Sequence, residues 1–410
     1  ADADADTGAG GVTGDSGEPP PADPIPPVFE REATAFSAEH VVAEEHVHAE
    51  LFTIPADWDG DGDTDIVVVN EWTGSLAVSH QVDHRTFAEP VATTTTSVAV
   101  AIDALTAMHG GTFTSNNISV VRGATYRHTV DGPEGVLLQL QVAGGSDWAA
   151  AGYDPVVLMT ADGGVLMSLQ PTNGFLVLSD INGDGIDEVL IANKDSGGDI
   201  LWSGDPSART PLPMDVLITL KFPFSGEVAV SNAETGEFIF IPGGWGSSPV
   251  DTVYHLQASE SGATVVTTTP VGFDSRLVLG NPKHPVPQPF FATQHDQPIT
   301  QFVGSTRTSI VGTEGDEQFG NPSRFAQFDG VGGYDLLEIS SSTNRRAWMA
   351  TPDGSWLLVD VPTAELTGNI EHADGLFAQD LDGDGRAELV RGGAGDSINY
   401  YQIIWWNNTE

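Results

Sequence analysis

The sequence predicts an all-β fold built from small repeated sheets, and three observations support it. Short apolar runs rich in β-branched residues follow one another from residue 51 onward, and many of the 47 glycines and 26 prolines separate them. An acidic, glycine-containing loop occurs three times, each time directly before such a run. No long amphipathic helix is evident between these runs. Because one small twisted sheet cannot bury its own faces, we expect the sheets to pack around an axis as a β-propeller of seven or eight four-stranded blades.

The repeated loop has nine positions, with oxygen-bearing side chains at positions 1, 3, 5 and 9 and glycines at positions 4 and 6. The glycines allow a tight turn that a Cβ atom would obstruct. The three copies are Asp57–Asp65, Asp180–Glu188 and Asp380–Glu388.

So many carboxylates in nine residues repel one another unless a cation lies among them. Flexible, oxygen-only sites suit Ca²⁺, which takes roughly 6–8 oxygen ligands. We therefore expect about three calcium ions, with side-chain ligands at positions 1, 3, 5 and 9 and the backbone carbonyl of position 7. The expected ligands are Asp57, Asp59, Asp61, Asp63 (carbonyl) and Asp65; Asp180, Asn182, Asp184, Ile186 (carbonyl) and Glu188; and Asp380, Asp382, Asp384, Arg386 (carbonyl) and Glu388.

An EF-hand would need a bidentate Glu at position 12 and a helix on each side of the loop. Position 12 is Val68, Ile191 or Arg391, and a strand-like run follows each loop. The pattern instead resembles the FG-GAP/VCBS repeat of integrin-type and related bacterial β-propellers. The resemblance implies a propeller fold, calcium in the loops, and an extracellular setting with adhesion or ligand recognition.

Five weaker relatives of the loop place a polar residue or glycine before an apolar run. They are residues 117–121, 152–158, 226–230, 272–279 and 329–337. Together with the full copies they give eight markers, near residues 65, 117, 154, 188, 227, 274, 335 and 388, which suggest seven or eight blades. We expect the weaker copies to keep the turn without the ion.

The two ends of the chain carry separate predictions. Residues 1–27 are rich in Ala, Asp, Gly and Pro and are expected to form a disordered tether, followed by the propeller over residues 28–410. The segment Val28–Phe36 is expected to pair with the last strand, Ile398–Trp406, and so to complete the last blade. Residues 37–50, with several Glu and His, can form a short helix or an edge strand.

Composition excludes some classes of function. Asp and Glu number 58 against 15 Lys and Arg, a net charge of −43, so the surface should repel nucleic acid and anionic membranes. With no cysteine, disulfides and thiolate metal sites are excluded. No apolar run is long enough to insert into a membrane. The expected location is extracellular, or anchored at the cell surface through the N-terminal tail.

No catalytic constellation or cofactor-binding motif is evident, so the chain is expected to be a binding or adhesion module for a carbohydrate or protein ligand rather than an enzyme. Sugar-stacking candidates are Trp72, Trp148, Trp202, Trp245, Trp348 and Trp356, although tryptophans also wedge between blades. His80 and His84 lie four apart, but their region indicates strand and turn. One alternative is a polysaccharide lyase or hydrolase, which a cluster of Arg122, Arg127 and His128 would favour. Another is a self-assembling structural subunit of a surface assembly or filament.

Overall fold

The structure is a computed structural model of the whole chain. It describes residues 28–34, 51–83, 86–109, 113–115, 118–142, 154–169, 172–193, 197–212, 227–232, 236–241, 250–279, 290–293, 300–303, 306–309, 323–330, 333, 335–340, 344–353, 356–360, 376–383, 385–394 and 399–407. The expected tether 1–27, residues 37–50, Trp148, Trp245 and His84 lie outside these ranges.

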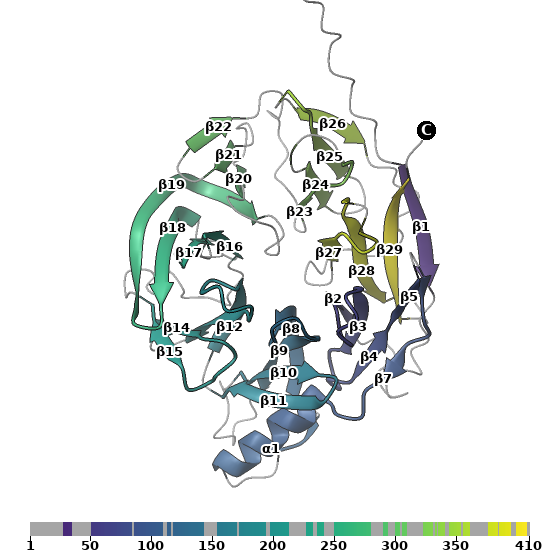
Figure 1. The fold of residues 1–410 in the computed structure, drawn as a ribbon, viewed down its shortest axis with the longest axis vertical. Helices are drawn as coiled ribbons and strands as arrows, with labels where there is room; N and C mark the ends of the chain where they lie inside the picture. The colour runs from purple at the N-terminus through teal and green to yellow at the C-terminus, as the bar shows by residue number, and fades with distance from the viewer. Residues whose placement is uncertain are drawn as a thin grey trace, which may run out of the picture.

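Small antiparallel sheets stand around a common centre (Figure 1). The described residues form five four-stranded sheets, one seven-stranded sheet and a two-stranded ribbon. The first sheet has the order β2 (Leu51–Ala56), β3 (Asp65–Asn70), β4 (Leu76–Ser79) and β7 (Val91–Ala92), beside the ribbon of β5 (Gln81–Asp83) and β6 (Thr86–Phe87).

The next two sheets follow in chain order. The second contains β8 (Ile118–Arg127), β9 (Glu134–Val142), β10 (Val156–Thr160) and β11 (Gly163–Ser168). The third contains β12 (Thr172–Ser179), β13 (Glu188–Asn193), β14 (Gly197–Leu201) and β15 (Arg209–Pro211).

One long strand joins two four-stranded groups into the seven-stranded sheet. Its strands are β16 (Glu227–Asn232), β17 (Glu237–Ile241), β18 (Val250–Ser259), β19 (Gly262–Leu279), β20 (Phe290–Thr293), β21 (Thr300–Val303) and β22 (Thr306–Ser309). The first part of β19 pairs with β18, while Arg276–Leu279 pairs with β20. Strand β19 therefore belongs to both groups.

The last of the remaining two sheets pairs a strand near the N-terminus with the last strand. One contains β23 (Ser323–Ala326), β24 (Asp335–Ser340), β25 (Asn344–Ala350) and β26 (Trp356–Asp360). The other has the order β1 (Val28–Thr34), β29 (Asn399–Asn407), β28 (Glu388–Ala394) and β27 (Leu376–Gln379). Pairs run from Val28↔Asn407 to Thr34↔Tyr401, which confirms the expected pairing of the N-terminal segment with the last strand.

The strands nearest the centre contact one another in series. Strand β2 contacts β8, β8 contacts β12, β12 contacts β16, β16 contacts β19, β19 contacts β23, β23 contacts β27, and β27 contacts β2. Each of these strands belongs to a different four-stranded group, β19 through its second half.

The eight sequence markers do not correspond one to one with these groups. The markers near residues 117 and 154 both lie at strands of the second sheet, β8 and β10. A polar residue before an apolar run also occurs at other strand starts within one sheet, so the markers alone do not give the number of blades.

The core lies between neighbouring sheets, and this explains the uninterrupted apolar runs. Side chains on a strand alternate between its two faces. On β13, Leu190 packs with Trp202 and Phe238 toward the β16–β19 group, while Val189 and Ile191 pack with Tyr126 and Phe175 toward the second sheet. Both faces of β13 are therefore buried, and apolar residues occupy consecutive positions.

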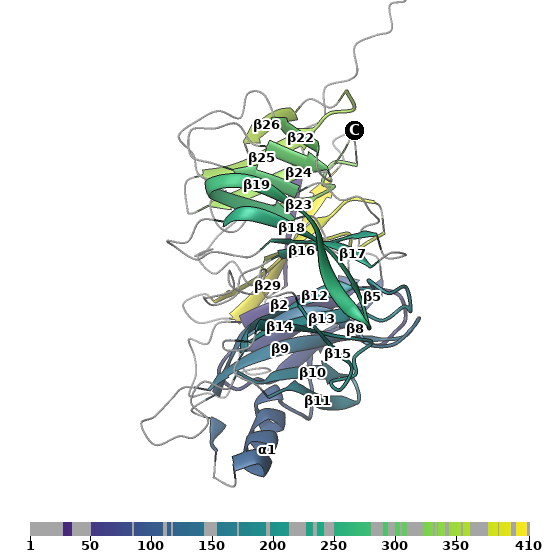
Figure 2. The same cartoon turned by 90° about the vertical axis from the view of Figure 1, so that its left-hand side faces the viewer.

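Helix α1 (Ser97–His109) corrects the expectation that no long amphipathic helix lies between the apolar runs. The Thr96 hydroxyl accepts a hydrogen bond from Ala99 N at 3.1 Å and caps its start. Val98, Ala101 and Leu105, spaced three and four residues apart, are buried against the first and second sheets. The helix projects from one end of the molecule beside β11 (Figure 2). In the described part of the chain, no helix combines the length and apolar character needed to cross a membrane.

Candidate metal centres

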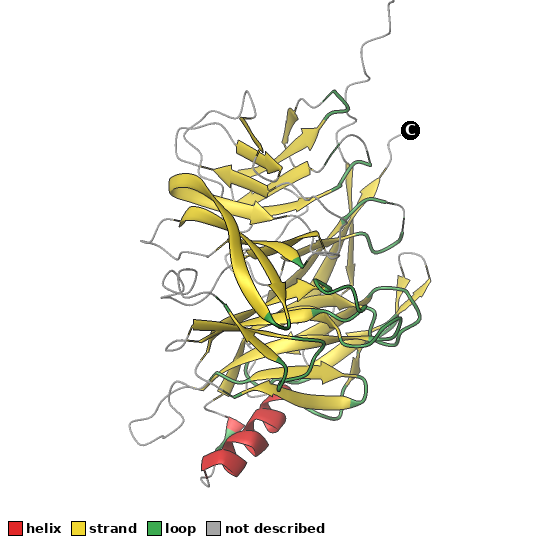
Figure 3. Cartoon of the chain, turned by 60° about the vertical axis from the view of Figure 1, so that its left-hand side comes forward, coloured by secondary structure: helices red, strands yellow, loops and turns green. Residues whose placement is uncertain are grey.

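The three acidic loops occupy equivalent places in three sheets. Each joins the innermost strand to the second strand: β2 to β3, β12 to β13, and β27 to β28. In Figure 3 most of the described loops lie along one side of the array of sheets. Because each acidic loop makes the same connection within its sheet, we expect the three to lie on one rim.

The first acid of each loop is held by the glycine backbone. Gly60 N and Gly62 N donate to the Asp57 carboxylate at 2.8 and 3.1 Å. The equivalent bonds reach Asp180 at 2.6 and 2.9 Å and Asp380 at 2.8 and 3.0 Å. The six glycines involved have φ between +75° and +95°, the left-handed region that favours glycine. The prediction that glycine makes this turn possible is confirmed.

The acid at position 9 binds backbone on both sides of the loop. Asp65 is 1% exposed and accepts hydrogen bonds from Trp58 N at 3.0 Å and Gln81 N at 2.9 Å. Glu188 is fully buried and accepts from Ile181 N at 2.8 Å and Ser203 N at 3.4 Å. We call this arrangement the backbone latch. In it, one carboxylate accepts hydrogen bonds from the backbone N–H of position 2 and from a backbone N–H just after the third strand of the sheet.

The third loop has the same latch from position 2, where Leu381 N donates to Glu388 at 2.8 Å. Burial raises the pKa of Glu188 to about 8, although the hydrogen bond from Ile181 N opposes the shift. Burial likewise raises the pKa of Asp65, against the hydrogen bond from Gln81 N and the nearby His80. A cation near either carboxylate would favour its charged form.

Carboxylate oxygens converge in the first and third loops. In the first, oxygens of Asp57, Asp59 and Asp61 lie within 4.8 Å of one another. In the third, Asp380, Asp382 and Glu388 form such a group, while Asp384 lies outside the described residues. These groups have the donor chemistry that Ca²⁺ prefers.

The second loop is arranged differently around its ligand candidates. The Asn182 side chain donates to Asp184 at 3.1 Å, and the Ser203 hydroxyl also donates to Asp184. Burial alone would raise the pKa of Asp184, but these hydrogen bonds and one from Ile186 N outweigh it and lower the pKa. The carbonyls at position 7, of Asp63, Ile186 and Arg386, stay predicted ligands.

A fourth loop shares the latch, at the weaker copy whose sequence marker is residue 335, the equivalent of residues 65, 188 and 388. It runs over residues 327–335, so that Gln327 occupies position 1 and Asp335 position 9. Fully buried Asp335 accepts from Phe328 N and Ala350 N, both at 2.8 Å, and from Asp329 N at 3.4 Å. The missed signal was the large apolar residue at position 2, which is Trp58, Ile181 and Leu381 in the full copies and Phe328 here.

Neighbouring loops and sheets are tied together by polar contacts. Asp57 N donates to the Glu134 carboxylate at 3.0 Å, and Arg127 pairs with Asp187 at 3.1 Å. Gln379, one residue before the third loop, donates to Thr64 of the first loop at 3.2 Å. Residues more than 300 positions apart thus meet on the rim.

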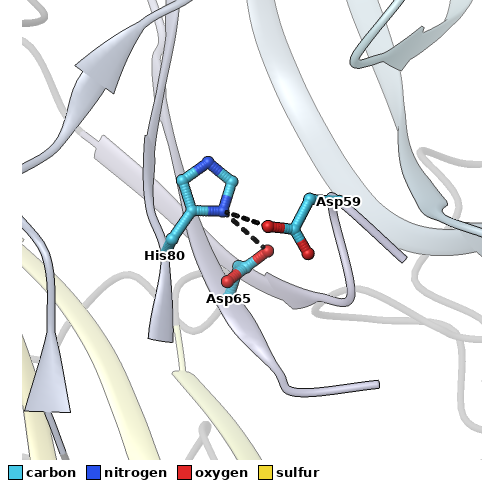
Figure 4. A group of neighbouring side chains, drawn as sticks. All are labelled: Asp59, Asp65 and His80. Atoms are coloured by element: carbon cyan, nitrogen blue, oxygen red, sulfur yellow. Dashed lines mark hydrogen bonds and ion pairs between the residues drawn. The ribbon is translucent and has the colours of Figure 1, made fainter. Parts of the chain in front are cut away.

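His80 lies against the first loop, a position that sequence spacing could not reveal. Its Nδ1 atom is 3.2 Å from Asp65 and 3.3 Å from Asp59 (Figure 4). In the sequence, His80 stands out only through its spacing of four from His84, in a region that indicates strand and turn, and no ligand role is expected for it there. The contact with the loop depends on the pairing of β3 with β4, which brings residue 80 beside residue 65.

Two groups singled out for other chemistry have structural contacts. Trp202 and Trp348 are buried, so neither can stack on a ligand, whereas Trp72 is 47% exposed. Arg122 donates to the Phe175 carbonyl at 3.3 Å, and Arg127 is engaged by Asp187. These two arginines fasten the second sheet to the third.

No protein-family model matches the chain, and no curated protein matches it in sequence. Among solved structures, BBS1N in complex with ARL6DN matches with a TM-score of 0.51 at 9% identity, over 94% of this chain and 99% of that one. A mitotic checkpoint complex chain gives 0.47 at 10% identity, over 94% and 96%. A six-bladed β-propeller, the fungal Aleuria aurantia lectin, gives 0.35 at 10% identity, over 78% and 97%. At such identities the first likeness shows an all-β, propeller-like fold and nothing about function.

Proposed function

We propose that this chain is a closed, seven-bladed β-propeller that binds about three calcium ions on one rim and serves as an extracellular binding or adhesion module. The unbroken series of inner-strand contacts, together with the β1–β29 pairing, supports seven blades. In this arrangement, strand β1 is the outer strand of the last blade, and its pairing with β29 closes the propeller.

Removal of that strand tests the closure. Deleting residues 28–34 exposes the edge of β29 along its whole paired length, so the melting temperature should fall by more than 10 °C. Deletion of residues 1–20 serves as the control and should leave the melting temperature unchanged. An unchanged melting temperature after removal of 28–34 would contradict closure by this strand.

The observation that carries the metal proposal is the convergence of loop carboxylates from positions 1, 3 and 5 or 9. It agrees with the resemblance to the FG-GAP/VCBS repeat, and it makes the metal's role structural: the ion neutralises the loop and fixes it between two strands. Calcium at millimolar concentration is an extracellular condition that suits such exposed sites.

The surface charge guides the choice of partner. A net charge of −43 repels nucleic acid and anionic lipid, which leaves proteins and neutral or basic glycans as partners. The lyase alternative needs free positive charge for an acidic sugar, and the engaged Arg122 and Arg127 do not provide it. We therefore propose a binding module without catalytic activity.

The functional test is a screen of immobilised glycans and cell-surface proteins against the purified chain in calcium and in chelator. Calcium-dependent capture of a defined glycan or protein is the expected result. Release of unsaturated sugars from a polysaccharide panel would instead establish a lyase. Light scattering that shows growing assemblies in calcium would favour the structural subunit.

A further inference from the structure

A histidine is joined to two carboxylates at the first loop, and this set differs from the oxygen-only groups of the other loops. His80 lies between β4 and β5, and its Nδ1 atom faces Asp59 Oδ2 at 3.3 Å and Asp65 Oδ2 at 3.2 Å (Figure 4). All three ligand atoms lie within 4.8 Å of one another.

One ring nitrogen carries at most one proton, so it cannot give a strong hydrogen bond to both carboxylates at once. A metal ion at the same place would contact all three atoms. Ligand atoms about 2.0–2.1 Å from a tetrahedral zinc are about 3.3 Å apart, which is the separation of the imidazole nitrogen from each carboxylate here.

The donor set also discriminates between kinds of metal. Calcium takes oxygen ligands, whereas imidazole nitrogen suits zinc and other divalent transition metals. Two carboxylates and one imidazole leave a fourth position for water, as in zinc sites with three protein ligands.

Burial makes the site partly preformed. The Asp65 side chain is 1% exposed and its carboxylate is oriented by backbone N–H groups of Trp58 and Gln81. The side chains of His80 and Asp59 are 34% and 45% exposed, so an ion can enter from solvent and retain a water ligand. One ligand is therefore fixed by the fold, and the other two can close on the ion.

The other latched loops have no nitrogen ligand at this place. In the first sheet, Ile66 of β3, the residue after the loop, pairs with Ser79 of β4. His80 is the residue that follows Ser79. At the other three latched loops, the residues equivalent to His80 in strand pairing are Trp202, Met349 and Trp405. Trp202 and Met349 are buried in the core, so His80 distinguishes the first loop from these.

We propose that Asp59, Asp65 and His80 form a binding site for one divalent transition metal, with zinc as the probe, separate in metal preference from the calcium groups. The site shares Asp59 and Asp65 with the expected calcium ligands of the first loop, so this loop can respond to two kinds of metal. This inference does not depend on calcium binding elsewhere.

The test is isothermal titration of zinc chloride into the chelator-stripped full chain. Wild-type protein should bind one zinc at this site, and His80→Gln, which keeps a polar side chain without the imidazole, should lose at least tenfold in affinity. Asp59→Asn should weaken zinc binding similarly. Asp61→Asn, in the same loop but outside the zinc group, should keep the wild-type affinity.

Two controls separate this site from other histidines and from misfolding. The double variant His46→Ala/His48→Ala removes the His-Val-His sequence and should keep the zinc affinity. Each variant should retain the wild-type melting temperature in chelator. Co²⁺ should give visible absorption with wild type that is lost in His80→Gln.

Zinc affinity that is unchanged in His80→Gln, or lost in the His46→Ala/His48→Ala variant, would overturn the proposal and leave an ordinary histidine–carboxylate pair. Calcium titration of the same samples reports on the calcium loops, so the two proposals can fail separately.

Discussion

The loops at residues 57–65 and 327–335 have the same backbone frame and different side chains around it. In both, the backbone N–H of the apolar residue at position 2 donates to a buried acid at position 9. The bond runs from Trp58 N to Asp65 at 3.0 Å in the first loop and from Phe328 N to Asp335 at 2.8 Å in the other. Position 4 is a glycine with φ of +79° or +75°. Positions 1 and 5 are both Asp in the first loop, but Gln327 and Val331 in the other.

The backbone latch can therefore form in a loop that lacks the acids expected to bind an ion. Asp335 holds its loop without the acids at positions 1 and 5 that would bind calcium. In the full loops, the position 9 acid likewise accepts backbone hydrogen bonds, and the less buried acids nearer the start of the loop are those whose repulsion needs a cation. In the third loop, Glu388 at position 9 also lies within the group of converging carboxylates.

The largest effect is expected from breaking the latch where no ion is expected. Asp335→Ala leaves buried N–H groups of Phe328 and Ala350 without an acceptor, which should cost about 2–4 kcal/mol of unfolding free energy. Denaturant titration should give the same loss in calcium and in chelator. Asp353→Ala, an exposed acid of the same sheet, is the matched control and should change little. A loss seen in calcium alone would mean that the latch depends on a metal.

The next effect should appear only with the metal. Asp61→Ala removes an exposed ligand candidate and should lower the melting temperature by several degrees in calcium, with little change in chelator. Asp63→Asn keeps the backbone carbonyl that is the predicted ligand at position 7, and should bind calcium nearly as well as wild type. Equal losses for Asp61→Ala in both conditions would contradict a metal role for this carboxylate.

A pH comparison sharpens the description of the buried latch. Burial raises the pKa of Asp335 to about 8, with the nearby Asp329 charge acting in the same direction and backbone hydrogen bonds opposing it. A folded-state pKa above the unfolded one means that this group's contribution is full below about pH 4 and is lost as pH rises toward 8. Asp335→Asn does not titrate, so the stability advantage of wild type over this variant should shrink by at least about 1 kcal/mol between pH 5 and pH 8. Denaturation in chelator measures it, and an advantage that grows with pH would refute this description.

The smallest effect concerns the links between loops. Thr64→Val removes the acceptor for Gln379 and should cost about 0.5 kcal/mol, the low end for a partly exposed hydrogen bond. At the loop of residues 327–335 the link is between backbone atoms, from Ala387 N to the Gln327 carbonyl at 2.6 Å, so Gln327→Ala should leave it intact. A loss of unfolding free energy above about 2 kcal/mol for Thr64→Val would contradict this assignment of a single partly exposed hydrogen bond.

Local pattern predicted much of the fold. Glycine positions and apolar runs predicted the three acidic loops and the strands after them. The expected pairing of Val28–Phe36 with the last strand, which would complete the last blade, is confirmed over Val28–Thr34. Helix α1 was missed because its Ser-Val-Ala-Val-Ala start alternates as a strand does, and packing against two sheets determined its conformation.

The candidate site was predicted only in part. The loop acids lie within nine residues of one another in sequence, so their proximity could be predicted. The position of His80 depends on strand register, and that of Glu134 beside Asp57 depends on how two sheets pack, neither of which a local pattern contains. The latch role of Asp65 was missed because its backbone donors include Gln81, 16 residues away.

Thermal unfolding of the purified chain in calcium and in chelator, with metal analysis of the same samples, tests the central claim most directly. We expect about three bound calcium ions and a melting temperature that rises by several degrees or more with calcium. The chelated protein should still unfold cooperatively, because the backbone latches remain. Absence of bound calcium, together with identical melting curves, would contradict it and would make the loops acidic turns held by their backbone latches alone.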